Sequence, residues 1–114
     1  MIKRKEEITI TTENNGEGKT KLYLSNLRDF DKAPEKLRMY AKASLLPNEE
    51  VEFHVHEGEC EFYYIISGKA LYDDNGTKLQ VEAGDVTFTP SGSGHGIKNI
   101  SSEPLEFMAL IVKD

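Results

Sequence analysis

Three histidines and one glutamate are the residues whose types and spacing could do chemistry together. His54 and His56 stand two positions apart at the end of a strand-like segment, and side chains at such positions of a strand point to the same face. Two imidazoles on one face can reach a common metal ion. Glu61 follows a short turn that contains Gly58, and a chain reversal there would return its carboxylate to the same point. His95 follows a glycine-rich stretch, which can bring a third imidazole close without steric hindrance.

The elements that must position these side chains are predicted to be short β-strands separated by turns. Residues 14–18 separate the β-prone runs 8–11 and 22–24, which predicts an N-terminal hairpin. Residues 74–76 carry the Asn-Gly signature of a tight hairpin turn, and residues 83–85 form a further turn signal. This punctuation predicts an all-β barrel or sandwich.

One segment argues for a different element. Residues 33–43 are rich in good helix formers, and Asp31 could cap a helix there. Taken alone, this segment predicts a helix. No repeat or low-complexity tract is present in the sequence, so a single domain is expected.

The chain resembles the cupins, a family that carries two sequence motifs. The first, G-x5-H-x-H-x3,4-E-x6-G, is matched from His54 to Gly68, but Asn48 stands in place of its opening glycine. Asn tolerates left-handed backbone angles nearly as well as glycine, so only the conformation of that turn is affected. The second motif, G-x5-P-x-G-x2-H-x3-N, is complete from Gly84 to Asn99. The fifteen residues between the motifs match the short spacer of small single-domain cupins.

This resemblance covers residues from roughly 37 to 112 and implies a small antiparallel β-barrel or jelly roll, the double-stranded β-helix of the cupins. Cupins place a strand before the histidine pair, so residues 37–46 are expected to form a strand against their helix propensity. We expect residues 1–36 to form a hairpin and connecting loop packed on a barrel of residues 37–114, in a single domain overall.

The metal ligands that the resemblance implies are His54, His56, Glu61 and His95. Imidazole and carboxylate suit borderline divalent metals, so the expected cofactor is one divalent ion, Mn, Fe, Zn, Ni or Co. Four protein ligands would leave about two positions of an octahedral ion open to water or substrate. Two alternatives use the same residues: a closed tetrahedral zinc with a structural role, and a cluster that has lost its metal.

Glu52 and Tyr63 are the candidate catalytic residues beside the metal ligands. Strand alternation puts Glu52 on the face of His54, where it could move a proton to or from a substrate; the alternative is a solvated carboxylate at the rim. Tyr63 shares the parity of Glu61. Its hydroxyl could orient a metal-bound ligand, or its ring could pack in the core.

Three further residues have weaker claims to a function. Cys60 has the opposite parity from Glu61, so we expect a packed small side chain rather than a nucleophile. Arg38 and Lys42 share one strand face and could bind a substrate carboxylate, but a solvated face is the preferred interpretation. Asn99 is expected to be structural.

The charge balance excludes some classes of partner. Fourteen basic and twenty acidic residues give a net charge of −6, and an acidic surface repels nucleic-acid phosphates. We expect no membrane partner, because no apolar run approaches the length of a spanning helix, about 20 residues. Glu6 and Glu7 stand where a signal peptide needs apolar residues, and a single cysteine agrees with a reducing compartment. A cytoplasmic protein is expected.

The leading functional hypothesis is a small metal-dependent enzyme acting on a small polar molecule as a dioxygenase, isomerase or decarboxylase. The alternative is a non-catalytic small-molecule-binding or sensory module. Oxalate chemistry is disfavoured, because oxalate decarboxylases have two domains and an arginine just upstream of the histidine pair, whereas residues 51–53 contain none. A basic residue from elsewhere could substitute. We expect a homodimer in which the N-terminal hairpin extends a sheet across a two-fold axis.

Overall fold

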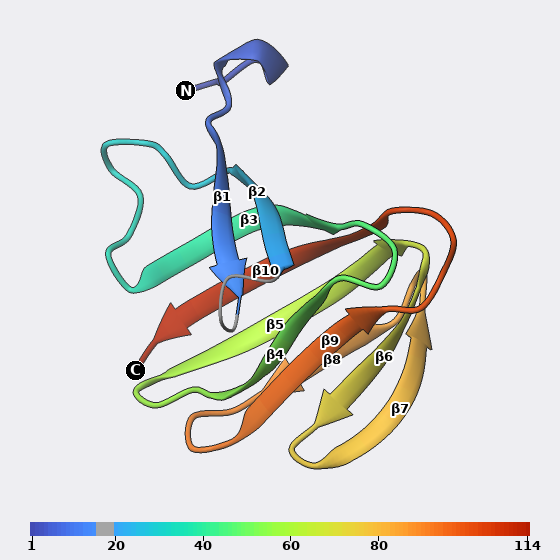
Figure 1. Ribbon diagram of the computed structural model, residues 1–114. Helices are drawn as coiled ribbons and strands as arrows, with labels where there is room; N and C mark the ends of the chain where they lie inside the picture. The colour runs from blue at the N-terminus through green and yellow to red at the C-terminus, as the bar shows by residue number, and fades with distance from the viewer. Residues whose placement is uncertain (16–19) are drawn as a thin grey trace.

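The chain folds into two antiparallel β-sheets in the computed structural model, which describes residues 1–15 and 20–114 (Figure 1). The six-stranded sheet has the order β1-β2-β3-β10-β5-β8 and consists of β1 (Ile10–Asn15), β2 (Thr20–Asn26), β3 (Leu37–Leu45), β10 (Leu105–Lys113), β5 (Glu59–Ser67) and β8 (Val86–Thr89). The four-stranded sheet has the order β4-β9-β6-β7 and consists of β4 (Glu50–Val55), β9 (Gly94–Asn99), β6 (Lys69–Asp74) and β7 (Thr77–Glu82). This architecture confirms the predicted all-β jelly-roll class.

Helical structure is confined to one short turn in the described part of the chain, the 3-10 helix Lys5–Glu7. Among the described residues, no helix has the length and apolar character needed to cross a membrane.

Strand β3 occupies the segment whose local propensity favours a helix. Its inward positions alternate, and Ala41, Ala43 and Leu45 are fully buried. The strand pairs with β10 on one side and β2 on the other. Pairing on both edges and burial of every second side chain override a weak preference for helix. The strand expected from the cupin resemblance is therefore correct, and the helix expected from propensity alone is wrong.

The turns agree with the residues that form them. The β6–β7 hairpin turns through Asn75 and Gly76, both at positive φ (49° and 102°), as a tight hairpin turn requires. Asn48, which replaces the first motif glycine, has a φ of 68°, so its side chain does not prevent the left-handed turn. Strands β1 and β2 pair as the predicted N-terminal hairpin. Residues 16–19 of its loop lie outside the described residues.

The core lies between the sheets and receives side chains from both. Leu22 and Leu24 of β2 belong to it, so the N-terminal hairpin contributes to the same core as the later strands. The proposed boundary between residues 1–36 and 37–114 stays a prediction. On β5 the buried positions include Glu61 and Tyr63, and this part of the core is therefore polar.

Candidate metal centre

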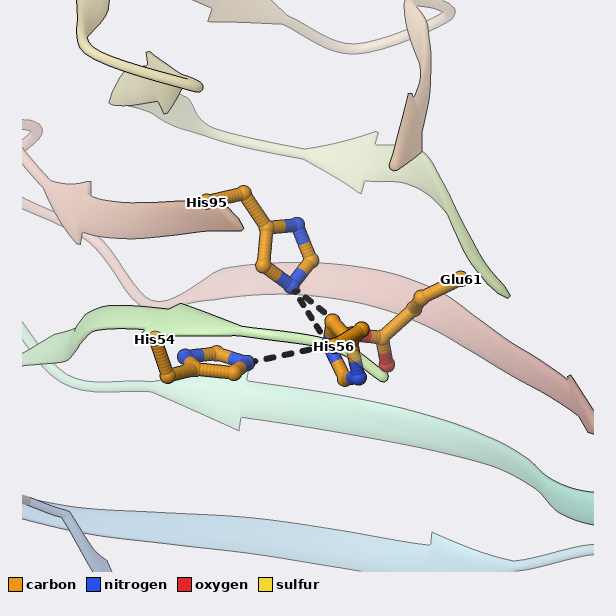
Figure 2. Close-up of side chains that lie close together, drawn as sticks. All are labelled: His54, His56, Glu61 and His95. Atoms are coloured by element: carbon orange, nitrogen blue, oxygen red, sulfur yellow. Dashed lines mark hydrogen bonds and ion pairs between the residues drawn. The ribbon is translucent and has the colours of Figure 1, made fainter. Parts of the chain in front are cut away.

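Three strands and one turn bring the predicted ligands together. His54 lies on β4, His56 follows its end, Glu61 lies on β5 and His95 on β9. In the pairing of β4 with β9, His54 lies directly opposite His95. One possible ligand atom from each residue can be chosen so that all lie within 4.8 Å of one another, and Figure 2 shows the side chains converging. This group could hold a metal ion.

The three imidazoles turn the same nitrogen toward the centre. The Nε2 atom of His56 lies 3.1 Å from Nε2 of His54 and 3.2 Å from Nε2 of His95. The Oε1 atom of Glu61 lies 2.9 Å from Nε2 of His56 and 2.8 Å from Nε2 of His95. His56, Glu61 and His95 are buried, and His54 is half-buried at the edge of the group.

The outer nitrogen of each imidazole has its own partner. Nδ1–H of His54 donates to the Glu52 carbonyl at 2.8 Å, and Nδ1–H of His56 donates to the Glu59 carboxylate at 2.9 Å. Nδ1 of His95 lies 2.9 Å from the Tyr72 hydroxyl. A carbonyl or carboxylate oxygen only accepts, so the outer nitrogens of His54 and His56 carry the protons. Such partners fix the tautomer and ring orientation of metal-binding histidines.

This hydrogen bonding directs electron pairs into the centre. With Nδ1 protonated, neutral His54 and His56 present Nε2 lone pairs to each other and to the Glu61 carboxylate. Only a proton or a metal cation between these acceptors relieves their repulsion. Two neutral imidazoles, a third from His95 and a carboxylate suit divalent Mn, Fe, Co, Ni or Zn. The donor set therefore fits a divalent ion.

The pKa shifts follow the same charge pattern. When His56 is protonated, its Nε2–H can donate to Glu61, and this hydrogen bond raises the pKa of His56, whereas desolvation lowers the pKa of His54. Burial acts to raise the pKa of Glu61, but the hydrogen bonds and charges of protonated His56 and His95 together outweigh it, and the pKa is lowered. Glu61 is thus held ionised next to a site that favours positive charge.

Glu59 was missed by the sequence analysis. It accepts from His56 and also from both Nε and Nη2 of Arg38, at 2.7 and 2.8 Å. The hydrogen bond from Arg38 lowers the pKa of Glu59 and keeps it charged. Its position had a signal in the sequence, because Glu59 has the same parity as Glu61 and Tyr63 on their strand. Tyr72, the partner of His95, had no such signal.

The expectation for Arg38 and Lys42 needs correction. The β3–β10 register shifts between the pairs Ile111–Met39 and Val112–Leu37, which leaves Arg38 at a β-bulge. Bulges re-aim side chains, and Arg38 lines the cavity beside the histidines, so it does not share the face of Lys42. Both side chains are partly solvated, as expected, with 43% and 44% exposed. Lys42 pairs with Glu106 at 3.0 Å.

The two candidate catalytic residues lie beside the centre. Glu52 is exposed and lines the same cavity as His54. The Tyr63 ring is buried, stacks on His95 with ring centroids 4.8 Å apart and packs against Phe107. Burial, with the nearby charge of Glu61, raises the pKa of Tyr63 well above its usual value, so its hydroxyl stays protonated at neutral pH. A catalytic role for either residue stays a prediction.

The centre opens into a cavity of about 440 Å³. Polar groups from the metal centre, Arg38 and Glu52 line one part. Much of the remaining lining is apolar and comes from β2, β3 and β10, including Leu24, Met39 and Ile111. Polar and apolar groups line the cavity in comparable measure, and a cavity of this size with convergent polar groups is typical of small-molecule sites.

Comparison with known proteins agrees with this arrangement. Residues 41–112 match the cupin domain family. The chain is 39% identical over 113 residues to an oxalate-binding protein of Thermotoga maritima, covering 98% of this chain and 93% of that protein. It is 31% identical over 99 residues to an oxalate decarboxylase of Bacillus subtilis, of which it spans only 25%.

Solved structures show the same fold. A crystal structure from Thermotoga maritima, described as a predicted oxalate decarboxylase, superposes with a TM-score of 0.89 at 38% identity and full coverage of both chains. A cupin 2 conserved barrel protein from Salinispora arenicola superposes with a TM-score of 0.78 at 21% identity, covering 99% of this chain and 88% of that one. On the family match, the shared fold and the preserved motifs, the chain belongs to the cupin family.

Proposed function

We propose that this cupin binds one divalent metal ion through His54, His56, Glu61 and His95 and uses the metal to bind a small carboxylate anion. The observation that carries the proposal is the inward orientation of the Nε2 atoms, two of which have their tautomers fixed by outer hydrogen bonds. When bound, such a metal supplies positive charge and open coordination positions. The four protein ligands carry one negative charge, so a divalent ion leaves the centre with a positive charge that attracts an anion.

Oxalate is the first anion to test. Two relatives are named for oxalate, one as an oxalate-binding protein and one as an oxalate decarboxylase. Residues 51–53 lack the arginine that oxalate decarboxylases carry upstream of the histidine pair, which disfavours oxalate, but Arg38 lines the cavity from β3. A basic residue from elsewhere in the chain is therefore present near the centre, although its guanidinium is paired with Glu59.

Turnover of the bound anion is the second candidate function. It is supported by two groups that could carry protons beside the centre. The Glu52 carboxylate is exposed at the cavity, where it could exchange protons with solvent and substrate. Tyr63 stays protonated and could only donate. Decarboxylase, isomerase and dioxygenase activities remain the reaction types to assay.

Calorimetric titration of oxalate tests the proposal. Protein loaded with Mn²⁺ should bind oxalate, and metal-free protein and the His95→Ala variant should not. Equal binding to the metal-free protein would contradict a metal-dependent site. Incubation of the loaded protein with oxalate, followed by assay for formate, then separates a binding protein from a decarboxylase. A Glu52→Gln variant should lose turnover and keep binding if Glu52 moves the proton.

We further propose that the protein is a cytoplasmic homodimer. The single, half-buried cysteine agrees with a reducing compartment. The outer side of the six-stranded sheet carries two cross-strand rows, Tyr40–Leu110–Phe62–Phe88 and Lys42–Met108–Tyr64–Val86. We call these eight residues the outer apolar face. Tyr64, Val86 and Phe88 are 52%, 65% and 48% exposed.

A second copy of this chain is the partner that the outer apolar face fits. The protein carries a net charge of −6, so two copies repel each other wherever their charged surfaces meet. In the two rows the charged residue is Lys42, which is already paired with Glu106. Contact through this face would bury aromatic side chains without bringing unpaired acidic groups together. Exposed apolar areas of this kind mark association sites.

A further inference from the structure

The size of the cavity does not match oxalate. A water molecule accounts for about 30 Å³, and oxalate is comparable to roughly three waters. The cavity beside the metal centre measures about 440 Å³. Oxalate bound at the metal would therefore leave most of the cavity to solvent, in contact with apolar side chains.

One side of the cavity is apolar and begins at the metal centre. On β10, Ile111 lies opposite Glu61 of β5, and its other neighbour is Met39 of β3. We define the apolar wall as the cavity residues of β2, β3 and β10 that continue from this point: Leu22, Leu24, Met39, Phe107, Ala109 and Ile111. Met39 is half-buried and the other five residues are buried, so the wall is firmly packed and presents limited apolar area to the cavity. A ligand held at the metal would extend along this wall and cover that area, chiefly at Met39.

The charges at the cavity mouth oppose a second anionic group. Glu13 and Glu52 line the cavity and are exposed, so their carboxylates lie where the cavity meets solvent. Arg38 also lines the cavity, but its Nε and Nη2 atoms donate to the Glu59 carboxylate, at 2.7 and 2.8 Å. An anionic group far from the metal would face two carboxylates and an already neutralised guanidinium.

We infer that the ligand for which this cavity is built is a monocarboxylate larger than oxalate, with a metal-chelating head and an uncharged apolar body that packs on the apolar wall. The inference rests on the proposed metal centre and names the class of ligand that the centre takes. A 2-oxo acid with a branched aliphatic side chain has this construction, because its carboxylate and 2-oxo oxygen chelate and its side chain is apolar.

Titration of the Mn²⁺-loaded protein with a series of 2-oxo acids tests the inference. Pyruvate, 4-methyl-2-oxopentanoate and 2-oxoglutarate share one chelating head and differ in the body. We expect 4-methyl-2-oxopentanoate to bind at least about tenfold more tightly than pyruvate, since each added carbon that is buried against apolar side chains increases the affinity. 2-Oxoglutarate should bind no better than pyruvate. Equal affinities for the first two acids, or tightest binding of 2-oxoglutarate, would overturn the inference.

Variants at Met39 test whether the apolar wall causes the difference in affinity between the 2-oxo acids. Met39→Glu should reduce the affinity for 4-methyl-2-oxopentanoate at least about tenfold more than the affinity for oxalate, because both anions meet the new charge but only the larger one packs on residue 39. The matched control Met39→Leu should retain binding of both anions and of Mn²⁺. Equal effects of the two variants would contradict a role for the wall. The ligand series on the unmodified protein decides the question even if Met39→Glu fails to fold.

The same experiment separates this inference from the proposed function. If oxalate and all three 2-oxo acids bind the loaded protein without discrimination, the metal site stands and the inference about the body of the ligand is wrong. If Mn²⁺ itself does not bind, the proposed function is wrong and the inference fails with it.

Discussion

Each histidine of the metal centre is held by a different kind of partner on its outer side. His54 donates to a backbone carbonyl, His56 to a carboxylate, and His95 contacts a tyrosine hydroxyl. Arg38 in turn holds the carboxylate with two hydrogen bonds. These contacts set the ring orientations before any ligand arrives, so a metal ion would meet donors that already point at it.

Removing the carboxylate behind His56 should weaken metal binding. We predict that Glu59→Ala lowers the affinity for Mn²⁺ by about tenfold or more, because His56 loses the acceptor that fixes its tautomer. The matched control is Glu57→Ala, which removes an exposed carboxylate from the connection just before β5 and should change the affinity less than about twofold. Calorimetry on both variants provides the comparison. Equal affinities for the two variants would show that Glu59 does not position His56.

The raised pKa of Tyr63 should make the free energy of unfolding depend on pH in the alkaline range. Burial raises its pKa in the folded state, whereas in the unfolded chain it titrates near the usual value, about 10. The unfolded state therefore loses this proton first, and the free energy of unfolding falls as the pH rises above about 10.

The variant Tyr63→Phe should show a shallower alkaline loss of stability than the parent. Urea unfolding of metal-free protein at pH values from about 8 to 11 measures the slopes. Identical slopes would mean that Tyr63 does not stay protonated in the folded state. The Tyr63 hydroxyl also hydrogen-bonds Glu61, so the comparison of slopes is made without metal to keep the titration of Tyr63 apart from any change in metal binding.

At the scale of the elements, strand alternation predicted much of the site. It placed His54 with His56 and Tyr63 with Glu61, because both pairs lie on or next to regular strands. It could not place Arg38, which sits at a bulge between two register pairs. A bulge depends on how two distant strands pair, and the sequence of one strand does not specify this.

The element with the poorest local signal was β3. Its residues favour a helix by propensity, and the resemblance to cupins, not the propensity, predicted a strand. The signal that propensity ignores is the alternation of small buried residues such as Ala41 and Ala43 with outward ones. Tyr72, the partner of His95, lies on β6, the strand that pairs with β9. Which strands become neighbours in a sheet depends on the whole fold, and the sequence of one strand does not specify it.

Asn99 connects the end of β9 to the end of β3 and to the loop that leads into β10. Its side-chain amide donates to the carbonyls of Leu45 and Glu103, and its oxygen accepts from Ser101. The residue is fully buried. Asn99 therefore acts structurally in this arrangement, as its position in the second motif suggested.

The variant Asn99→Ala should lower the free energy of unfolding by about 1–3 kcal/mol, since buried carbonyls would lose their donor. Urea unfolding of metal-free protein provides the measurement. The control Ser102→Ala changes an exposed side chain in the same loop and should stay within about 0.5 kcal/mol of the parent. A loss that small for Asn99→Ala would contradict its structural role.

At the scale of the whole molecule, the six-stranded sheet has two different faces. Its inner face supplies the core, Glu61 and the apolar wall, and its outer face carries the two exposed rows. Leu22 and Leu24 of the N-terminal hairpin pack in the same core as the later strands. We propose on this basis that residues 1–36 and 37–114 fold as one domain.

The oligomeric state of two variants shows whether a dimer forms through the outer apolar face or through the N-terminal hairpin. We predict that the parent sediments as a dimer and that Tyr64→Glu, in the middle of the outer apolar face, sediments as a monomer, because a charge would be buried at the contact. The control Ile10→Glu changes a residue on edge strand β1 that is 67% exposed and should leave the dimer intact. The opposite pattern would place the contact at the N-terminal hairpin, and a monomeric parent would contradict both surfaces.

The metal content of the purified protein tests the central claim most directly. Protein prepared without a histidine tag would be analysed for bound metals beside the variants His54→Ala and His95→Ala. We predict about one equivalent of a divalent metal in the parent and little in either variant. Less than about a tenth of an equivalent in the parent, not recovered after incubation with Mn²⁺, Fe²⁺, Co²⁺, Ni²⁺ or Zn²⁺, would contradict the claim that these four residues form a metal site.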